Sequence, residues 1–205
     1  PHNPTVIVSD LKIGFKIPRR RRVIERDQLP VWWETVSSLE PRQRIYLTFL
    51  LLTGARRAES LGLQWDDVDL DRAIFTLRET KNGTDATLPL PTTVVSMLRP
   101  YQADTGPVFD KVGGVQSLVN KVKRRSGIEF SVHDLRRTFV STANGIDVNF
   151  YTVKHLVNHA ISAADVTAGY DVPNIDRLRT ASRKIEAEFL RQAGKLDANV
   201  ISLIK

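Results

Sequence analysis

The sequence predicts a mainly α-helical protein with a small antiparallel β-hairpin or sheet, an α+β fold. Apolar residues recur at helical spacing along most of the 205 residues, and residues 73–90 change to a period of two. Hydrophobic residues make up 41% of the chain and charged residues 26%, which is ordinary for a globular protein and excludes disorder over most of its length. We expect one large domain, or one domain with an appendage.

The first 24 residues are expected to form a linker, because they contain prolines and show no sustained periodicity. The basic character of this segment fits two interpretations: a solvated arm, or a segment that binds along the phosphate backbone of a nucleic acid. Since the chain begins at Pro1 rather than at Met, we also expect it to be a fragment of a longer protein. The largest part of the positive charge of this segment comes from four consecutive arginines, Arg19, Arg20, Arg21 and Arg22.

Three helices are predicted before the β region. The first follows Asp27, a potential cap, and carries an apolar stripe as far as residue 36. The second begins at Pro41 and ends at Gly54, a residue suited to a left-handed cap. Apolar residues surround this second helix almost completely, so we expect it to be buried. A third, short helix is expected over residues 57–63.

A β-hairpin is predicted next. Residues 73–77 and 86–90 alternate as strands do, and an Asn-Gly turn at 82–83 lies between them. Pro89 should make the second strand an edge strand, because proline has no N–H to donate. Helices are expected again over residues 92–103, 115–125, 133–144, 149–159, 163–170 and 174–193, and the last residues, 199–205, are apolar and extended in character.

The composition excludes several classes of chemistry. The chain has no Cys, which removes thiol nucleophiles, thiolate-bound zinc, iron–sulfur clusters and disulfides. It has no P-loop and no dinucleotide-binding or nucleophile-elbow motif. The net charge of +7 favours a polyanionic partner, most often nucleic acid. The longest apolar run, residues 45–52, is too short to span a bilayer, so no membrane partner is expected.

Two patterns suggest a metal site, and both lack a required residue. The acidic stretch 66–71 is followed by Arg72 where a calcium loop needs Gly, and its alternating apolar residues look like the start of a strand. His155 and His159 are four residues apart, but the Glu of a zinc helix is replaced by Leu156. We therefore expect neither a metal nor a cofactor.

Arg56 is the first candidate for binding an anion. It follows Gly54, where one helix ends, and stands at the start of the next helix. Backbone N–H groups and the helix dipole already favour negative charge there. A surface arginine paired with Glu59, three residues on, is the alternative.

His133 and Arg136 are three residues apart and should share one face of a helix, where they can converge on a ligand. Apolar residues upstream should anchor one face of the preceding helix and leave basic residues together on the other. A solvated basic helix is the alternative reading. The basic residues concerned are Lys121, Lys123, Arg124, Arg125 and, after the histidine, Arg137.

Tyr170 stands between Gly169 and Asp171, which is unusual for a core tyrosine, although a half-buried packing role is also possible. Combined with two arginines, a lysine at a hairpin turn and two histidines, it suits an attack on a phosphodiester without metal. Arginine clamps phosphate oxygens, tyrosine can be the covalent nucleophile, and lysine or histidine can protonate the leaving alkoxide.

The motifs, in this order, resemble the catalytic domain of the tyrosine recombinases, particularly the phage-type integrases. The resemblance covers roughly residues 25–185 and implies the fold of that domain. Two departures stand out: the family commonly has Gly where Asn158 stands, and the gap from His159 to Tyr170 is slightly longer than in many members. The shared motifs are Thr-Gly-x-Arg-x-x-Glu at 53–59, Thr-Lys at 80–81, His-x-Leu-Arg at 133–136, Asn-His at 158–159 and the late Tyr170.

The resemblance implies a role for each matching residue. Arg56 and Arg136 would hold the scissile phosphate, His159 would hydrogen-bond to it, and Glu59 would orient Arg56. The remaining three would carry out the transfer: Tyr170 attacks to give a 3′-phosphotyrosine and a free 5′-hydroxyl, Lys81 protonates the leaving oxygen, and His133 assists proton transfer from the tyrosine.

The resemblance also implies an organisation and a partner. Residues 1–24 would be a basic linker from a missing N-terminal core-binding domain, 25–195 the catalytic domain, and 196–205 a segment that docks on a neighbouring protomer or on its own domain. Double-stranded DNA would be the partner. The protein would be a monomer in isolation and would form a tetramer on DNA. It would act in the bacterial cytoplasm at the nucleoid and would be encoded by a bacterium or a phage. A type IB topoisomerase-like enzyme and a non-catalytic DNA-binding regulator are the alternatives.

Overall fold

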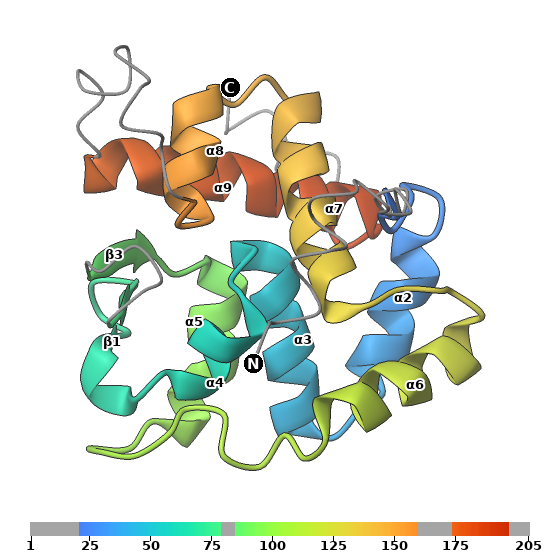
Figure 1. Ribbon diagram of the computed structural model, residues 1–205, viewed down its shortest axis with the longest axis horizontal. Helices are drawn as coiled ribbons and strands as arrows, with labels where there is room; N and C mark the ends of the chain where they lie inside the picture. Colours follow the sequence, from blue (N-terminus) through green and yellow to red (C-terminus); the bar gives the residue numbers. More distant parts are fainter. Residues whose placement is uncertain (1–20, 79–84, 160–173, 197–205) are drawn as a thin grey trace, which may run out of the picture.

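The computed structural model describes residues 21–78, 85–159 and 174–196. Its helices surround a central helix, α3 (Pro41–Thr53), and a small sheet lies at one side (Figure 1). The mainly helical fold with a small antiparallel sheet is confirmed. Over these residues no helix is long and apolar enough to cross a membrane.

Helix α2 (Leu29–Ser37) buries the predicted apolar stripe, and α3 is buried along its last nine residues, from Ile45 to Thr53. The predicted cap of α2 is wrong: Gln28 occupies the N-cap position, and no side chain caps the helix. Asp27 lies in the preceding turn, where Pro30 in the first helical turn removes one of the N–H groups that a cap would serve.

Gly54 ends α3 in the left-handed conformation, with φ of 63°. A Cβ atom on this residue would lie 2.9 Å from Cδ1 of Phe139 and 3.0 Å from Cγ1 of Val157. Both backbone conformation and space therefore require glycine. The chain continues into the short helix α4 (Arg57–Gly62), so the predicted helix–cap–helix sequence is confirmed.

The sheet has three antiparallel strands in the order β1 (Val68–Asp69), β2 (Ile74–Leu77) and β3 (Ala86–Pro89). The two predicted strands pair with Phe75 opposite Leu88, and β3 is an edge strand, as Pro89 required. The short β1 confirms that the acidic stretch leads into a strand, after a 3-10 turn at Trp65–Asp67. The predicted Asn-Gly turn lies outside the described residues.

The remaining helices match the predicted ranges closely. The first of them is shorter than expected, because Pro100 converts its last turn into a 3-10 helix, Arg99–Tyr101. The predicted helix over 163–170 and the apolar end over 199–205 lie outside the described residues. The helices are α5 (Thr92–Leu98), α6 (Val115–Ser126), α7 (Val132–Gly145), α8 (Phe150–Leu156) and α9 (Ile175–Gln192).

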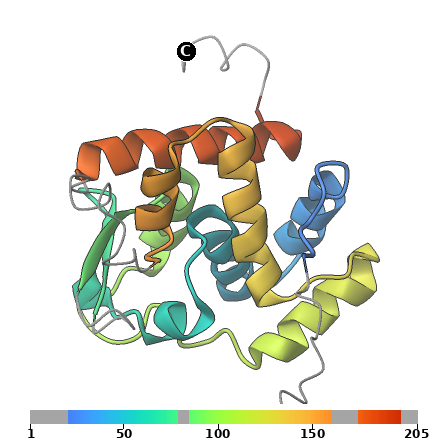
Figure 2. The same cartoon turned by 45° about the horizontal axis from the view of Figure 1, so that its top comes forward.

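Helix α9 runs across α7 and α8 on one side of the molecule, and α7 packs against α3 (Figure 2). Buried Glu186 of α9 accepts the backbone N–H groups of Thr92 and Thr93 and so caps α5. The N-terminal part of the chain is fastened to α7, because the Ile24 N–H donates to the Thr138 hydroxyl at 2.9 Å. These contacts hold α3, α7 and α8 in fixed relation. Of the candidate residues, His133 and Arg136 lie on α7, Arg56 caps the start of α4, and His159 follows the end of α8.

Candidate active site

Arg56 is held by one carboxylate and one carbonyl. Its guanidinium donates to Glu59 at 2.6 Å, and its backbone N–H donates to the second oxygen of the same carboxylate at 3.1 Å. The same guanidinium nitrogen donates to the backbone carbonyl of Asn158 at 2.9 Å. Its side chain remains 31% exposed, so part of the cation is free to meet a ligand from solvent. The pairing with Glu59 weighed from the sequence is present, and it leaves Arg56 accessible.

Arg136 lies deeper, with 7% of its surface exposed. It reaches from α7 to the end of α3, where it donates to the carbonyl of Gly54 at 2.7 Å. Burial, followed by repulsion from Arg56, lowers the pKa of Arg136 to about 10, and Glu59 acts in the opposite direction. At neutral pH this guanidinium is still a cation, because its pKa stays well above 7.

His133 lies on the first turn of α7 and is exposed. Partial burial lowers the pKa of its imidazole, and the charges of Arg137, Arg136 and Arg56 lower it further, against the opposing effect of Asp134. The charges of Arg56 and Arg136 therefore both act on the His133 imidazole. A lowered pKa keeps it neutral near pH 7, the form that can accept a proton.

His159 follows directly on the end of α8. The His159 N–H donates to the Lys154 carbonyl and the Asn158 N–H to the His155 carbonyl, both at 2.9 Å, while Asn158 is left-handed with φ of 46°. This is a Schellman motif, in which Gly or Asn takes the left-handed position. Asn158 thus adopts the left-handed conformation that the Gly common in the family would adopt. His159 is exposed and directly follows Asn158, the residue whose carbonyl accepts from Arg56.

The structure therefore brings together four of the six predicted catalytic residues. Lys81 and Tyr170 lie outside the described residues. In residues 21–78, 85–159 and 174–196, no group of three or more His, Asp or Glu side chains could hold a metal ion. Sequence reasoning missed the two carbonyls of Gly54 and Asn158, and the only signal for them was a residue that tolerates a left-handed backbone at each helix end.

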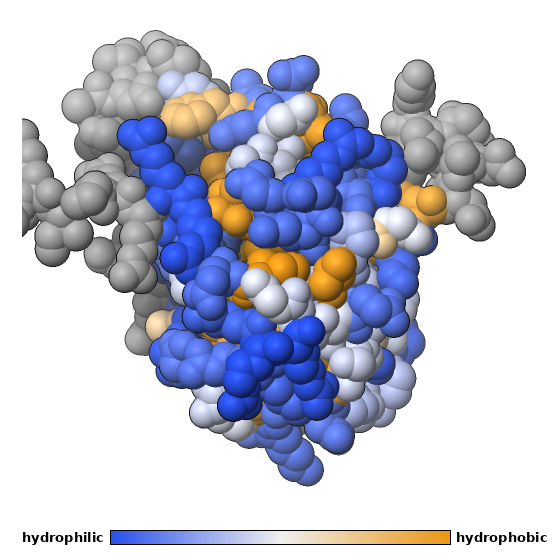
Figure 3. Space-filling view, turned by 90° about the vertical axis from the view of Figure 1, so that its right-hand side faces the viewer, coloured by the Kyte–Doolittle hydropathy of each residue, from blue (hydrophilic) through white to orange (hydrophobic). Residues whose placement is uncertain are grey.

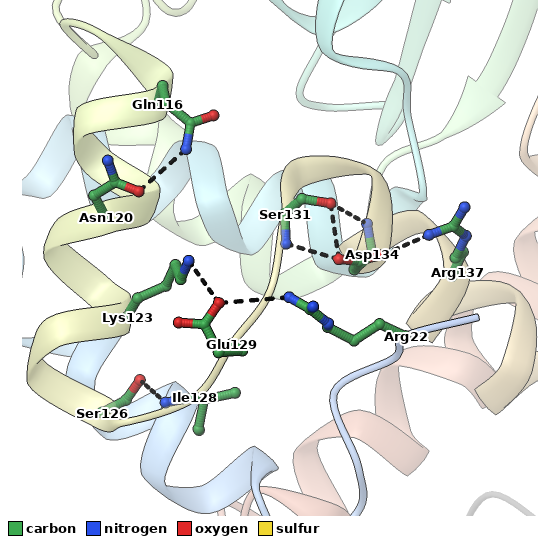
Figure 4. Close-up of polar contacts among 10 residues, drawn as sticks. All are labelled: Arg22, Gln116, Asn120, Lys123, Ser126, Ile128, Glu129, Ser131, Asp134 and Arg137. Carbon is green, nitrogen blue, oxygen red and sulfur yellow. Dashed lines mark hydrogen bonds and ion pairs between the residues drawn. The ribbon is translucent and has the colours of Figure 1, made fainter. Parts of the chain in front are cut away.

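Two of the predicted DNA-facing residues share an acidic partner. Lys123 of α6 lies 2.6 Å from the Glu129 carboxylate, and Arg22 of the N-terminal segment lies 3.5 Å from it (Figure 4). Glu129 is in the loop from α6 to α7 and its side chain is 64% exposed. A solvent-exposed carboxylate thus holds cations from two separate segments at one point.

Arg137 is paired as well. It donates to buried Asp134 at 2.6 Å, while the second oxygen of that carboxylate accepts from the hydroxyl and N–H of Ser131 (Figure 4). This capping box fixes the start of α7, the turn that carries His133. Arg137 therefore stabilises the helix start as well as adding positive charge near the site.

The other predicted DNA-facing residues differ in exposure. Arg124 and Arg125 are exposed at the end of α6, and Arg21 is exposed in the N-terminal segment. Lys121 is half-buried and donates to Gln43 at 3.4 Å. Figure 3 shows that the side of the molecule with α2 and α6 is mostly hydrophilic, with small apolar areas. Arg19 and Arg20 lie outside the described residues.

Residues 22–167 match the phage integrase family, and since they make up more than half of the chain, the protein belongs to that family. The resemblance to tyrosine recombinases is confirmed. Prophage integrase IntF of Escherichia coli (strain K12) is 30% identical over 186 residues, which are 83% of this chain and 40% of that relative. The chain spans between 40% and 64% of the length of curated relatives of this kind.

Solved structures share the fold. The integrase from mycobacterium phage Brujita superposes with a TM-score of 0.61 at 20% identity, over 95% of this chain and 68% of that one. XerH site-specific recombinase, bound to difH substrate in a pre-cleavage complex, gives a TM-score of 0.57 at 17% identity, over 85% of this chain and 52% of that one. The fold expected of a tyrosine recombinase catalytic domain is therefore confirmed.

Proposed function

We propose that this chain is the catalytic part of a site-specific DNA recombinase, an integrase, that cleaves and rejoins strands through a 3′-phosphotyrosine without metal or ATP. The carrying observation is the arrangement of two arginines: Arg136 donates to the carbonyl of Gly54, two residues before Arg56, and the charge of Arg56 lowers the pKa of Arg136. The charges of both arginines also lower the pKa of the His133 imidazole. Two fixed cations lower the energy of a phosphodiester that gains charge in the transition state. The recombinase relative bound to its substrate supports the same reading.

In the proposed reaction the Tyr170 oxygen attacks phosphorus, and the bond from phosphorus to the 5′ oxygen breaks. His133, neutral at pH 7, takes the tyrosine proton, and Lys81 protonates the departing 5′ oxygen. Arg56, Arg136 and His159 would hold the non-bridging oxygens. Rejoining reverses these steps with a new 5′-hydroxyl, so the bond energy is kept in the phosphotyrosine.

Trapping the covalent intermediate tests this function. We would mix the protein with nicked duplexes from the flanks of its own gene and identify the modified residue by mass spectrometry. Tyr170→Phe should abolish the adduct while DNA binding changes little, and Tyr151→Phe, the control on α8, should retain it. An adduct on Tyr151 would overturn the assigned nucleophile. DNA binding without any adduct would favour the non-catalytic regulator.

The products formed from plasmid DNA distinguish a recombinase from a type IB topoisomerase-like enzyme. A recombinase should convert a plasmid carrying two target sites into recombinant products, whereas a type IB topoisomerase-like enzyme would relax supercoiled plasmid without them. The motifs shared with a family of integrases favour recombination.

The proposed partner is double-stranded DNA, bound by a tetramer that assembles from monomers, within the bacterial cytoplasm at the nucleoid. The basic residues of α6, of the N-terminal segment and of the start of α7 suit contacts with DNA phosphates, which carry most of the salt dependence of DNA binding. Residues 196–205 would contribute to assembly by docking on a neighbour. The proposed DNA contacts are Arg19, Arg20, Arg21, Arg22, Lys121, Lys123, Arg124, Arg125 and Arg137.

A further inference from the structure

Two helix ends meet at the arginine pair. The end of α3 carries Gly54, and the end of α8 carries Val157 and Asn158; a Cβ on Gly54 would lie 3.0 Å from Cγ1 of Val157. Gly54 and Asn158 are both left-handed, with φ of 63° and 46°. The two caps are therefore neighbours, although they are far apart in sequence.

Each cap holds one arginine through its own backbone oxygen. The Gly54 carbonyl accepts from Arg136 at 2.7 Å, and the Asn158 carbonyl accepts from Arg56 at 2.9 Å. The direction of a carbonyl is set by the backbone angles on either side of it, so a change at residue 158 turns the acceptor away from Arg56. The next residue along the chain is His159, whose position depends on the same turn.

The left-handed conformation at Asn158 has a cost for ordinary residues. In this region the Cβ atom of an ordinary residue lies too close to the following carbonyl oxygen. Glycine has no Cβ atom, and asparagine adopts this conformation more readily than alanine does. An alanine at 158 would favour a different backbone turn, which would move the carbonyl and His159 together.

We propose that Asn158 is a positioning residue: its left-handed turn aims its carbonyl at the Arg56 guanidinium and so couples the placement of Arg56 to that of His159. The role of Asn158 in DNA cleavage rests on the proposed function. Its structural content, the placement of an anion-binding arginine, can be measured without DNA.

The test compares Asn158→Ala with Asn158→Gly, which keeps the left-handed turn. Asp147→Ala is the matched control, because Asp147 is also left-handed, with φ of 56°, and is exposed in the connection from α7 to α8. The first measurement is the affinity for inorganic phosphate from the shift in melting temperature. Asn158→Ala should weaken phosphate binding roughly tenfold, as expected when a binding group is misplaced, whereas Asn158→Gly and Asp147→Ala should stay close to wild type.

The second measurement is the single-turnover rate of cleavage on a nicked duplex. Asn158→Ala should slow cleavage by roughly tenfold to a hundredfold with little change in DNA affinity, and Asn158→Gly should recover most of the rate. Combined with Arg56→Ala, the effect of Asn158→Ala should shrink to the part that acts through His159, because the contact between residues 56 and 158 is already lost.

Two results would overturn the inference: equal losses in Asn158→Ala and Asp147→Ala that follow the loss of melting temperature, or additive effects of the 158 and 56 substitutions. If the wild-type protein forms no adduct, the proposed function fails while the phosphate measurement still decides the role of Asn158.

Discussion

Arg136 is a cation inside the protein, and its hydrogen-bond partner at Gly54 is a neutral carbonyl. Burial of a charge is unfavourable unless it is paired and hydrogen-bonded. Its carbonyl partner, Gly54, offers one bond, and Arg56 adds like charge that Glu59 offsets in part. The folded protein therefore holds positive charge that a bound phosphate or sulfate would neutralise.

We expect sulfate or phosphate to raise the melting temperature more than chloride at equal ionic strength. At about ten times the dissociation constant, the gain would be about 1.4 kcal/mol, or roughly 3–6 °C for a chain of this size. Differential scanning fluorimetry measures it. Arg136→Gln should remove the anion-specific part, and Arg124→Gln, the surface control, should keep it; an equal effect of both substitutions would contradict a site at the pair.

His133 should titrate below the ordinary histidine pKa. Partial burial and the charge of Arg137 are the largest causes of the lowered pKa, so Arg137→Gln should raise it toward 6.5. Because the folded-state pKa is depressed, the associated stability is fully present above pH 6.5 and is lost as the pH falls through the lowered value. NMR titration of the imidazole measures the pKa, and a value above 6.5 in the wild-type protein would contradict this electrostatic account.

Sequence alone singled out Arg56, His133, Arg136 and His159 as candidates, because each stands in a motif of recognisable spacing. It did not reveal that Arg56 contacts Asn158, because a backbone carbonyl is present on every residue and the contact spans 102 positions. The pairing of Glu129 with two cations was equally hidden, since ion pairs between separate segments depend on how these segments pack.

At the scale of elements, the end of α6 and the N-terminal segment meet at Glu129. Lys123 and Arg22 are proposed to contact DNA, yet in the DNA-free protein both pair with this carboxylate. A phosphate group would compete with Glu129 for the same cations. Exposed ion pairs of this kind contribute about 0–1 kcal/mol each, so the competition should be modest.

Glu129→Gln should therefore tighten DNA binding by roughly two- to tenfold and should steepen the dependence of log K on log salt, by about 0.9 for each additional phosphate contact. Fluorescence anisotropy at several salt concentrations measures both. Glu34→Gln is the control, because Glu34 is an exposed carboxylate that pairs with Lys195 elsewhere. Equal tightening by the two substitutions would indicate a general charge effect and would rule out competition at Glu129.

The helices were predictable where local signals agreed. Pro41 and Gly54 bounded α3 correctly, because proline suits a first turn and glycine a left-handed end. The cap of α2 and the end of α5 were less predictable, since several nearby residues could serve at each boundary and the packed structure decided among them. The pairing of β1 with β2 also depended on packing, because two residues form too short a periodic signal.

At the scale of the whole molecule, the catalytic candidates come together because α7 and α9 pack on α3 and α8. The order of motifs predicted the family and hence this arrangement, whereas periodicity alone predicted the elements without their contacts. The chain spans 40% to 64% of the length of its curated relatives, so assembly on DNA is a property to test on this chain directly.

Deletion of residues 196–205 should reduce assembly on DNA while the monomer keeps its melting temperature, if the segment docks on a neighbour. Size-exclusion chromatography with multi-angle light scattering on target duplexes measures assembly. A lowered melting temperature in the DNA-free monomer would indicate docking in cis, and unchanged assembly would reject docking in trans.

Because Arg56 and Arg136 are fastened to main-chain oxygens, the site constrains few side chains around it. Any residue has a carbonyl, so drift in the surrounding sequence leaves these contacts available as long as two turns keep their shape. In a saturation mutagenesis screen, position 54 should accept glycine alone and position 158 glycine or asparagine, while most neighbouring positions vary.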